Sequence, residues 1–247
     1  VTSAVPADRA RLRNQGALLK EVRELLTLSR GYGMESVRQR AMSTAETVSA
    51  SLSEVVDDST LELVVDLRLA FGRLLAALGA NERAEKEHLD TAELSLSQGW
   101  TETACAALAL ASHAAQARGD RASSGRAWRQ CRDAMESWPM NRPGERCGIL
   151  VDAVGDPLVA VQVLSALAEV LVDGVEEDHS RAPIIREIIS RASEQASRCV
   201  SPPQGAVESL ARVEERIAPY GRGRGGRRRP GSTTTITTDG QAAAGGK

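Results

Sequence analysis

The chain has 247 residues, of which 42% are apolar and only 2% aromatic, and its formal net charge is −2 at pH 7. These values suit a globular protein of one or two domains, and with Phe71 as the single phenylalanine the core has to be built mainly from Leu, Val, Ile and Ala, which favours helices over sheets. The longest apolar stretch, residues 158–172, is interrupted by Gln162, Ser165 and Glu169, so a transmembrane helix is not expected.

The first 30 residues spread arginine and lysine among leucines, which is typical of an amphipathic helix and not of the apolar centre of a signal peptide. The four cysteines, Cys105, Cys131, Cys147 and Cys199, lie far apart and form no Cys-x-x-Cys pair. We therefore expect free, mostly buried thiols and a cytoplasmic location.

Apolar residues recur with helical spacing along nearly the whole chain, as in the stripe of Leu18, Val22, Leu25 and Leu26. Glycines at the ends of such stripes mark helix ends, because glycine readily adopts positive φ. We expect an all-α fold whose consecutive helices pack as antiparallel hairpins, since the breaks between them are short. The expected helices cover residues 7–29, 34–53, 59–78, 81–97, 101–117, 121–137, 145–153, 157–172, 181–199 and 203–218.

The segment from Trp138 to Gly144 contains two prolines and a glycine, which stop a helix. It predicts a boundary between a helical hairpin array, residues 1–138, and a C-terminal helical subdomain, residues 145–219. The alternative is that it links two hairpins within one array.

Residues 220–247 form a tail rich in Gly, Arg and Thr, which we expect to be disordered because it has too little apolar mass to offset the entropy of ordering. From residue 221 onward six basic residues face one acidic residue, giving +5, which leaves −7 for residues 1–220. The tail resembles arginine-glycine segments that bind RNA and other polyanions, through arginine contacts to phosphate. Its candidate polyanion-binding residues are Arg222, Arg224, Arg227, Arg228 and Arg229.

Residues 59–139 resemble tetratricopeptide repeats. The first match is the spacing of Phe71-Gly72, Gly79 and Ala84, and the second is that of Ala115, Ala127, Ala134 and Pro139, where small residues let paired helices cross closely. The resemblance implies an α-solenoid of helical hairpins. The turn glycines at positions 31, 79 and 119 are 48 and 40 residues apart, so an irregular helical bundle is the alternative.

Two Glu-x-x-His pairs, Glu85 with His88 and Glu176 with His179, have the spacing found in di-iron helical bundles. Because both pairs lie in highly charged runs, we interpret them as solvated helix faces and expect no metal. His113 stands among alanines and is expected to be a partly buried structural histidine. The chain carries no recognised catalytic motif, so neither an enzyme activity nor a cofactor is expected.

The preferred hypothesis is a non-catalytic protein–protein interaction module, a helical-repeat adaptor or scaffold. Acidic residues near helix starts, Glu62, Asp66 and Glu102, are its candidate partner-binding residues and favour a basic protein or peptide. Self-association into a homo-oligomer is a further partner expectation, and no membrane contact is expected. The alternatives are a nucleic-acid-associated protein that uses its tail and a di-iron helical bundle.

Overall fold

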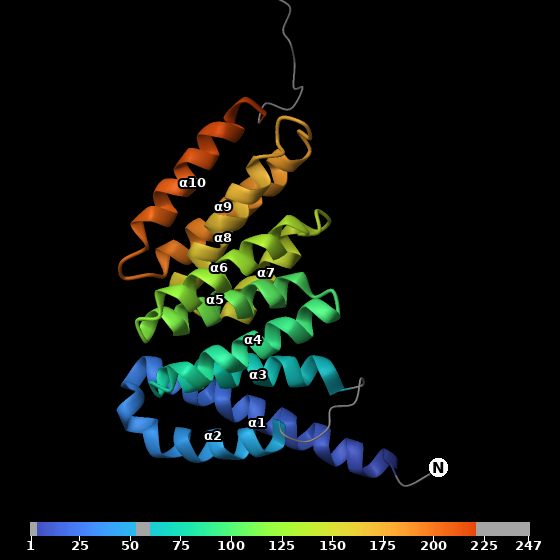
Figure 1. Ribbon diagram of the computed structural model, residues 1–247, viewed down its shortest axis with the longest axis vertical. Coiled ribbons are helices and arrows are strands. Elements are labelled where there is room, and N and C mark those ends of the chain that lie inside the picture. The colour runs from blue at the N-terminus through green and yellow to red at the C-terminus, as the bar shows by residue number, and fades with distance from the viewer. Residues whose placement is uncertain (1–3, 53–59, 221–247) are drawn as a thin grey trace, which may run out of the picture.

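The computed structural model describes residues 4–52 and 60–220, and within these ranges the protein consists of helices and short connections, with no strand (Figure 1). The all-α expectation is confirmed, and each expected helix is present with ends shifted by a few residues. The expected tail arginines and residues 53–59 lie outside the described ranges. The α-helices are α1 (Ala4–Tyr32), α2 (Arg38–Leu52), α3 (Leu61–Ala77), α4 (Asn81–Ser97), α5 (Thr101–Ala117), α6 (Arg121–Glu136), α7 (Pro143–Val154), α8 (Pro157–Val172), α9 (Arg181–Ser197) and α10 (Gln204–Ile217).

Three identical turns give the centre of the chain a regular repeat. Gly79, Gly99 and Gly119 end α3, α4 and α5 with φ of 82°, 72° and 83°, which an L side chain rarely adopts. In each turn the residue after the glycine donates its backbone N–H to a carbonyl five residues earlier, at 2.9, 2.9 and 3.0 Å. Successive helices therefore begin 20 residues apart, at Leu61, at 81, at 101 and at Arg121. The 48 residues from Gly31 to Gly79 do not fit this spacing, so the repeat is regular from α3 to α6 only.

The helices stack as an elongated array in which each helix packs on its neighbour in sequence, except where α6 passes to α7 (Figure 1). Alternate helices also pack: α1 on α3, α5 on α7 and α7 on α9 among the odd-numbered helices, and α6 on α8 and α8 on α10 among the even-numbered ones. Helices of the same parity run in the same direction, as bonds from Ser165 to Ala206 and from Arg216 to Asp173 show for α8 and α10.

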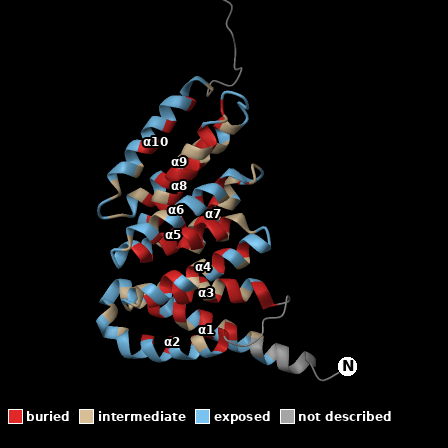
Figure 2. Cartoon of the chain, in the orientation of Figure 1, coloured by how far each residue is buried: buried red, intermediate tan, exposed pale blue. Residues whose placement is uncertain are grey.

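Two helices, α5 and α8, are enclosed on nearly all sides (Figure 2). Alanine is the commonest residue of α5, at eight of its 17 positions, and even Ser112 and Glu102 of this helix are buried. Because alanine projects only a methyl group, α4 and α6 can approach α5 closely from both sides. Neighbouring hairpins of the same chain thus cover nearly all sides of residues 101–117.

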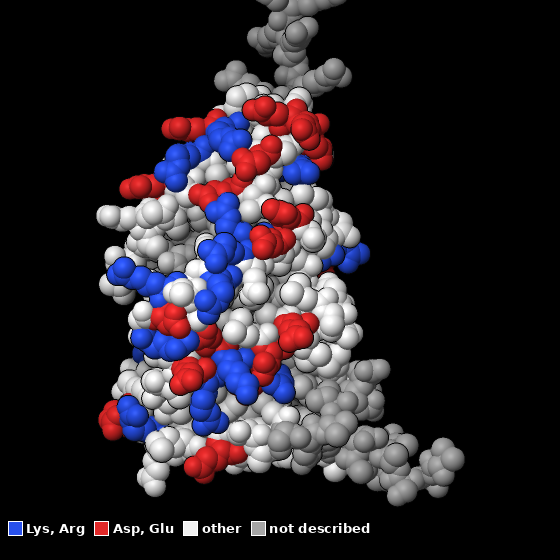
Figure 3. Space-filling model, in the orientation of Figure 1, with Lys and Arg blue, Asp and Glu red and all other residues white. Residues whose placement is uncertain are grey.

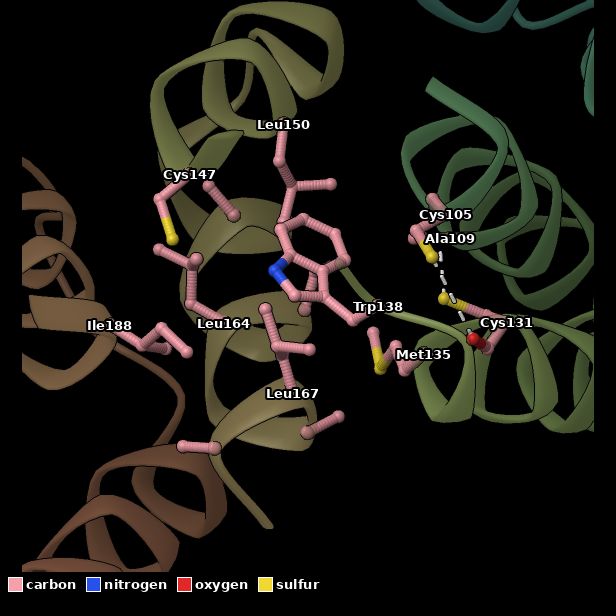
Figure 4. Packing of buried hydrophobic residues seen from close by; sticks show 14 of the residues in the cluster. Cys105, Ala109, Cys131, Met135, Trp138, Cys147, Leu150, Leu164, Leu167 and Ile188 are labelled. Carbon is pink, nitrogen blue, oxygen red and sulfur yellow. Dashed lines mark hydrogen bonds between the residues drawn. The ribbon is translucent and has the colours of Figure 1, made fainter. Parts of the chain in front are cut away.

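The described core consists of two clusters of buried side chains that meet at α3. One cluster joins α1 to α4, together with Ala114 of α5, around Phe71, and the other extends from α3 to α10 around Trp138. In Figure 4 the Trp138 indole lies among Met135, Leu150 and Leu167, which come from both sides of the 138–144 segment. The core is therefore continuous across the boundary expected between residues 1–138 and 145–219, and the segment links helices that share one core.

Candidate partner-binding grooves

A first groove, which we name the α6–α10 groove, lies between α5, α6, α8 and the N-terminal half of α10, and it has a volume of about 780 Å³. It exists because small residues line it where larger ones would close the space between helices: Ser124 and Gly125 on α6, Ser165 on α8, and Gly205 and Ala206 on α10. Its volume lies within the range of about 300–1,000 Å³ that is usual for ligand sites.

Several polar groups of the α6–α10 groove are already paired within the chain. The Ser112 and Ser124 hydroxyl oxygens are 3.0 Å apart, and Ser112 also donates to the Ser124 carbonyl at 3.0 Å. Glu169 accepts hydrogen bonds from Arg132, at 3.3 Å, and from Ser209. Because Glu169 is held by a guanidinium and a hydroxyl, it adds little free negative charge to the groove.

The rim of the same groove carries side chains with no ion pair or side-chain hydrogen bond in the described part of the chain. These are His113 and Gln116 on α5 and Arg121 on α6, all exposed, beside the half-buried Trp128 ring. The expectation that His113 is a partly buried structural histidine was wrong. Its position after Ser112 turns it out of the alanine-rich face and into the groove.

A second groove, the α4–α6 groove, has a volume of about 600 Å³ and a different lining. Its apolar surface includes Leu89 and Leu96 on α4 and the buried Leu108 on α5. Glu93 on α4 and Asp133 on α6 are exposed acidic residues of its lining. The α6–α10 groove is thus mixed and partly cationic, whereas this groove is apolar with carboxylates beside it.

The three acidic residues expected to contact a partner are not brought together in either groove. Glu62 is exposed, and Asp66 forms a 3.1 Å ion pair with Arg23 of α1. Glu102 is only 5% exposed and is paired with Arg146 of α7. Its position near the start of α5 suggested exposure, but α7 covers it, so it is not available to a partner in this structure.

The interpretation of Glu85 and His88 as a solvated face was also wrong. Glu85 is buried and accepts a hydrogen bond from the Arg118 Nε at 3.0 Å, and His88 is 1% exposed. The His88 ring occupies the space above Gly72 of α3, where a Cβ would collide with it. Burial, and secondly the nearby Arg73 charge, lower the pKa of His88 to about 3, so its imidazole is neutral at physiological pH.

The second Glu-x-x-His pair is exposed, as expected. Glu176 and His179 lie in the turn after α8, and the His179 ring is 4.8 Å from that of Tyr220. Across residues 4–52 and 60–220, no three His, Cys, Asp or Glu side chains are grouped as a metal site would require. Neither pair therefore shows a di-iron arrangement in these ranges.

The thiols are free, and Cys105, Cys131 and Cys147 are buried, as expected. The Cys105 and Cys131 thiols face each other between α5 and α6, where the Cys131 Sγ lies 3.4 Å from the Cys105 carbonyl (Figure 4). Burial raises the pKa of Cys147 to about 12, which suppresses the nucleophilic thiolate. These cysteines act as small core residues.

Comparison with protein-family models, with curated proteins and with solved structures finds no match to this chain. Of the helices in the described ranges, none combines the length and the apolar character needed to cross a bilayer. The grooves are therefore the features of the described structure that bear on function.

Proposed function

We propose that the protein is a non-catalytic interaction module, a helical-repeat adaptor that binds a polypeptide segment in the α6–α10 groove. The observation that carries the proposal is a large open groove lined by small residues from neighbouring helices of an otherwise tightly packed array. The resemblance to tetratricopeptide repeats agrees with this function, although the hairpins here repeat every 40 residues from Leu61 to Arg121 and that family repeats about every 34.

The side chains around the groove indicate what kind of segment fits. Among the described residues Arg121 and His113 have no side-chain partner, while Glu169 is engaged by Arg132 and Ser209. Gln162, which also lines the groove and makes no side-chain hydrogen bond in the described structure, can pair with a peptide backbone. These groups suit a polar or acidic segment, so the expected basic partner is not matched by this groove.

A groove-filling substitution tests the proposal. A Cβ at Gly125 meets no atom within 4 Å, so Gly125→Leu fills the groove without disturbing the fold. Gly148 of α7 is the matched control, because it is also a helical glycine with open space at its Cβ but lies in neither groove.

The assay selects peptides that bind the full chain from a displayed random library and then measures their affinity for the two variants. We expect Gly125→Leu to weaken binding about tenfold or more, as for loss of a well-packed contact, while Gly148→Leu changes it less than about twofold. Peptides that bind both variants as tightly as the wild type would place the site elsewhere, and a library that yields no binders would refute the proposed function.

A further inference from the structure

The even-numbered helices do not form a closed layer. α6 packs on α8 and α8 packs on α10, but α4 and α6 make no comparable contact, and the α4–α6 groove lies between them. Leu96 is half-exposed there, at 50%, and the groove reaches down to Leu108 on α5, which is 3% exposed. An apolar strip between two helices that run in the same direction has the form of a site for a third helix.

Two acidic residues beside this strip, Glu93 and Asp133, have no ion-pair partner in the described ranges. Glu93 and Asp133 each lie twelve positions after the first residue of their helix, Asn81 in α4 and Arg121 in α6, so the repeat places them at equivalent points on the two helices. Neither carboxylate takes part in an ion pair within the described part of the chain.

The opposite end of the groove differs. Glu85 forms an ion pair with Arg118, and the Arg126 guanidinium donates to the Ser123 hydroxyl at 2.7 Å. Free negative charge is therefore concentrated at the Glu93 end. In Figure 3, Lys and Arg side chains form a column down the face shown, with carboxylates on both sides, so charges of both signs alternate over short distances. Recognition by charge must accordingly be local to each groove.

We infer that the α4–α6 groove binds a basic amphipathic helix of a partner protein, with its apolar face on Leu96 and Leu108 and its Lys or Arg side chains against Glu93 and Asp133. The lining runs from Glu85 to Leu96, so about three helical turns fit along it at about 1.5 Å per residue. This inference rests on the proposed function as an interaction module but assigns a different groove, and it places there the basic partner that the sequence suggested.

Two synthetic helices of about 14 residues test the inference with the full chain. They share the same leucine face, and the remaining positions are Lys and Arg in one peptide and Glu in the other. Affinity is measured by fluorescence anisotropy of labelled peptide at about 0.15 M salt, where long-range attraction is largely screened. We expect the basic peptide to bind at least about tenfold more tightly than the acidic one.

Charge-reversal variants locate the contact. The double variant Glu93→Arg/Asp133→Arg is expected to bind the basic peptide about tenfold more weakly than the wild type, and Leu96→Ser about threefold or more. The control Glu208→Arg/Glu215→Arg changes the net charge equally on exposed residues of α10 outside this groove and should change binding less than about twofold.

Equal loss in the control and groove variants, equal binding of the two peptides, or no binding of the basic peptide would each overturn the inference. A dimer of the full chain that Glu93→Arg/Asp133→Arg dissociates would show that a second copy is the occupant, which also overturns it. Gly125→Leu is expected to leave binding of the basic peptide unchanged. A failure here is therefore distinguishable from failure of the α6–α10 groove.

Discussion

Acidification should destabilise the protein through one buried side chain, His88. Its ring lies between α3 and α4, its Nδ1 has no hydrogen-bond partner within residues 4–52 and 60–220, and the nearby Arg73 opposes a second positive charge. The folded protein therefore disfavours the protonated imidazole.

The magnitude follows from the two protonation equilibria. The pKa of His88 falls from its ordinary 6.5 to about 3 in the folded state, so between these values the unfolded chain binds a proton that the folded chain does not. The contribution of His88 is fully retained above pH 6.5 and is lost progressively as the pH falls toward 3. At about pH 5, which is about 1.5 units below the unfolded pKa, the folded protein has lost about 2 kcal/mol of unfolding free energy through His88, at about 1.36 kcal/mol per unit.

The assay is urea unfolding of the wild type and of His88→Leu at about pH 7.5 and pH 5, followed by circular dichroism. Other groups also titrate, so the quantity compared is the loss of unfolding free energy on acidification in each protein. We expect this loss to be about 2 kcal/mol smaller in His88→Leu than in the wild type. His88→Gln provides a second variant if Leu is poorly accommodated, and His113→Leu, which removes an exposed imidazole, should behave as the wild type. The reasoning would be refuted if the loss of unfolding free energy on acidification agreed within about 0.5 kcal/mol between the wild type and both His88 variants.

Three further outcomes follow from the packing. In the native protein Cys199 should be the one thiol of the four that reacts rapidly with a thiol reagent, and the Cys199→Ser variant should lose that fast phase, because the other three are buried. Trp138→Ala should lower the unfolding free energy by about 3–5 kcal/mol in chemical denaturation, since the indole is 3% exposed in the larger core cluster; a loss below about 1 kcal/mol would contradict this packing. Asp156→Ala should lower the unfolding free energy by about 1 kcal/mol, because the Asp156 carboxylate caps α8 by accepting hydrogen bonds from the backbone N–H groups of Leu158 and Val159. An unchanged unfolding free energy would show that the cap contributes nothing.

Local sequence determines the helices here because the signals that end them are local. The glycine turns and the Asp156 cap each act within a few residues, so periodicity and punctuation sufficed to predict ten helices and their approximate ends. The 20-residue spacing of Gly79, Gly99 and Gly119 is likewise readable from the sequence, whereas the 48 residues from Gly31 to Gly79 lie outside that regular series.

The burial of charged groups could not be predicted in the same way. Glu102 is covered by Arg146, 44 residues later in the sequence, and Glu85 is paired with Arg118, 33 residues later. A charged run looks solvated from its own sequence, and only the packing of a distant helix buries one of its faces. His88 is the extreme case, since the absence of a side chain at position 72 creates its space.

The grooves could not be predicted from the sequence for a related reason. Small residues such as Gly125 and Ala206 indicate close helix packing when read singly, and this interpretation holds for much of α5. When small residues from several helices face the same space and no larger side chain enters it, the result is a hollow. That coincidence depends on the register between α6, α8 and α10, which the sequence of each helix does not contain.

The most direct test of the central proposal is an NMR titration of the full chain with a display-selected peptide, observed at the glycine backbone amides. Gly119, Gly125 and Gly205 line the α6–α10 groove, whereas Gly16 in α1 and Gly148 in α7 lie away from it. We expect the signals of the three groove glycines to shift or broaden in proportion to bound peptide while those of the two remote glycines stay in place. Shifts confined to the remote glycines, or none at the groove while the peptide is bound, would contradict the assignment of this groove as the partner-binding site.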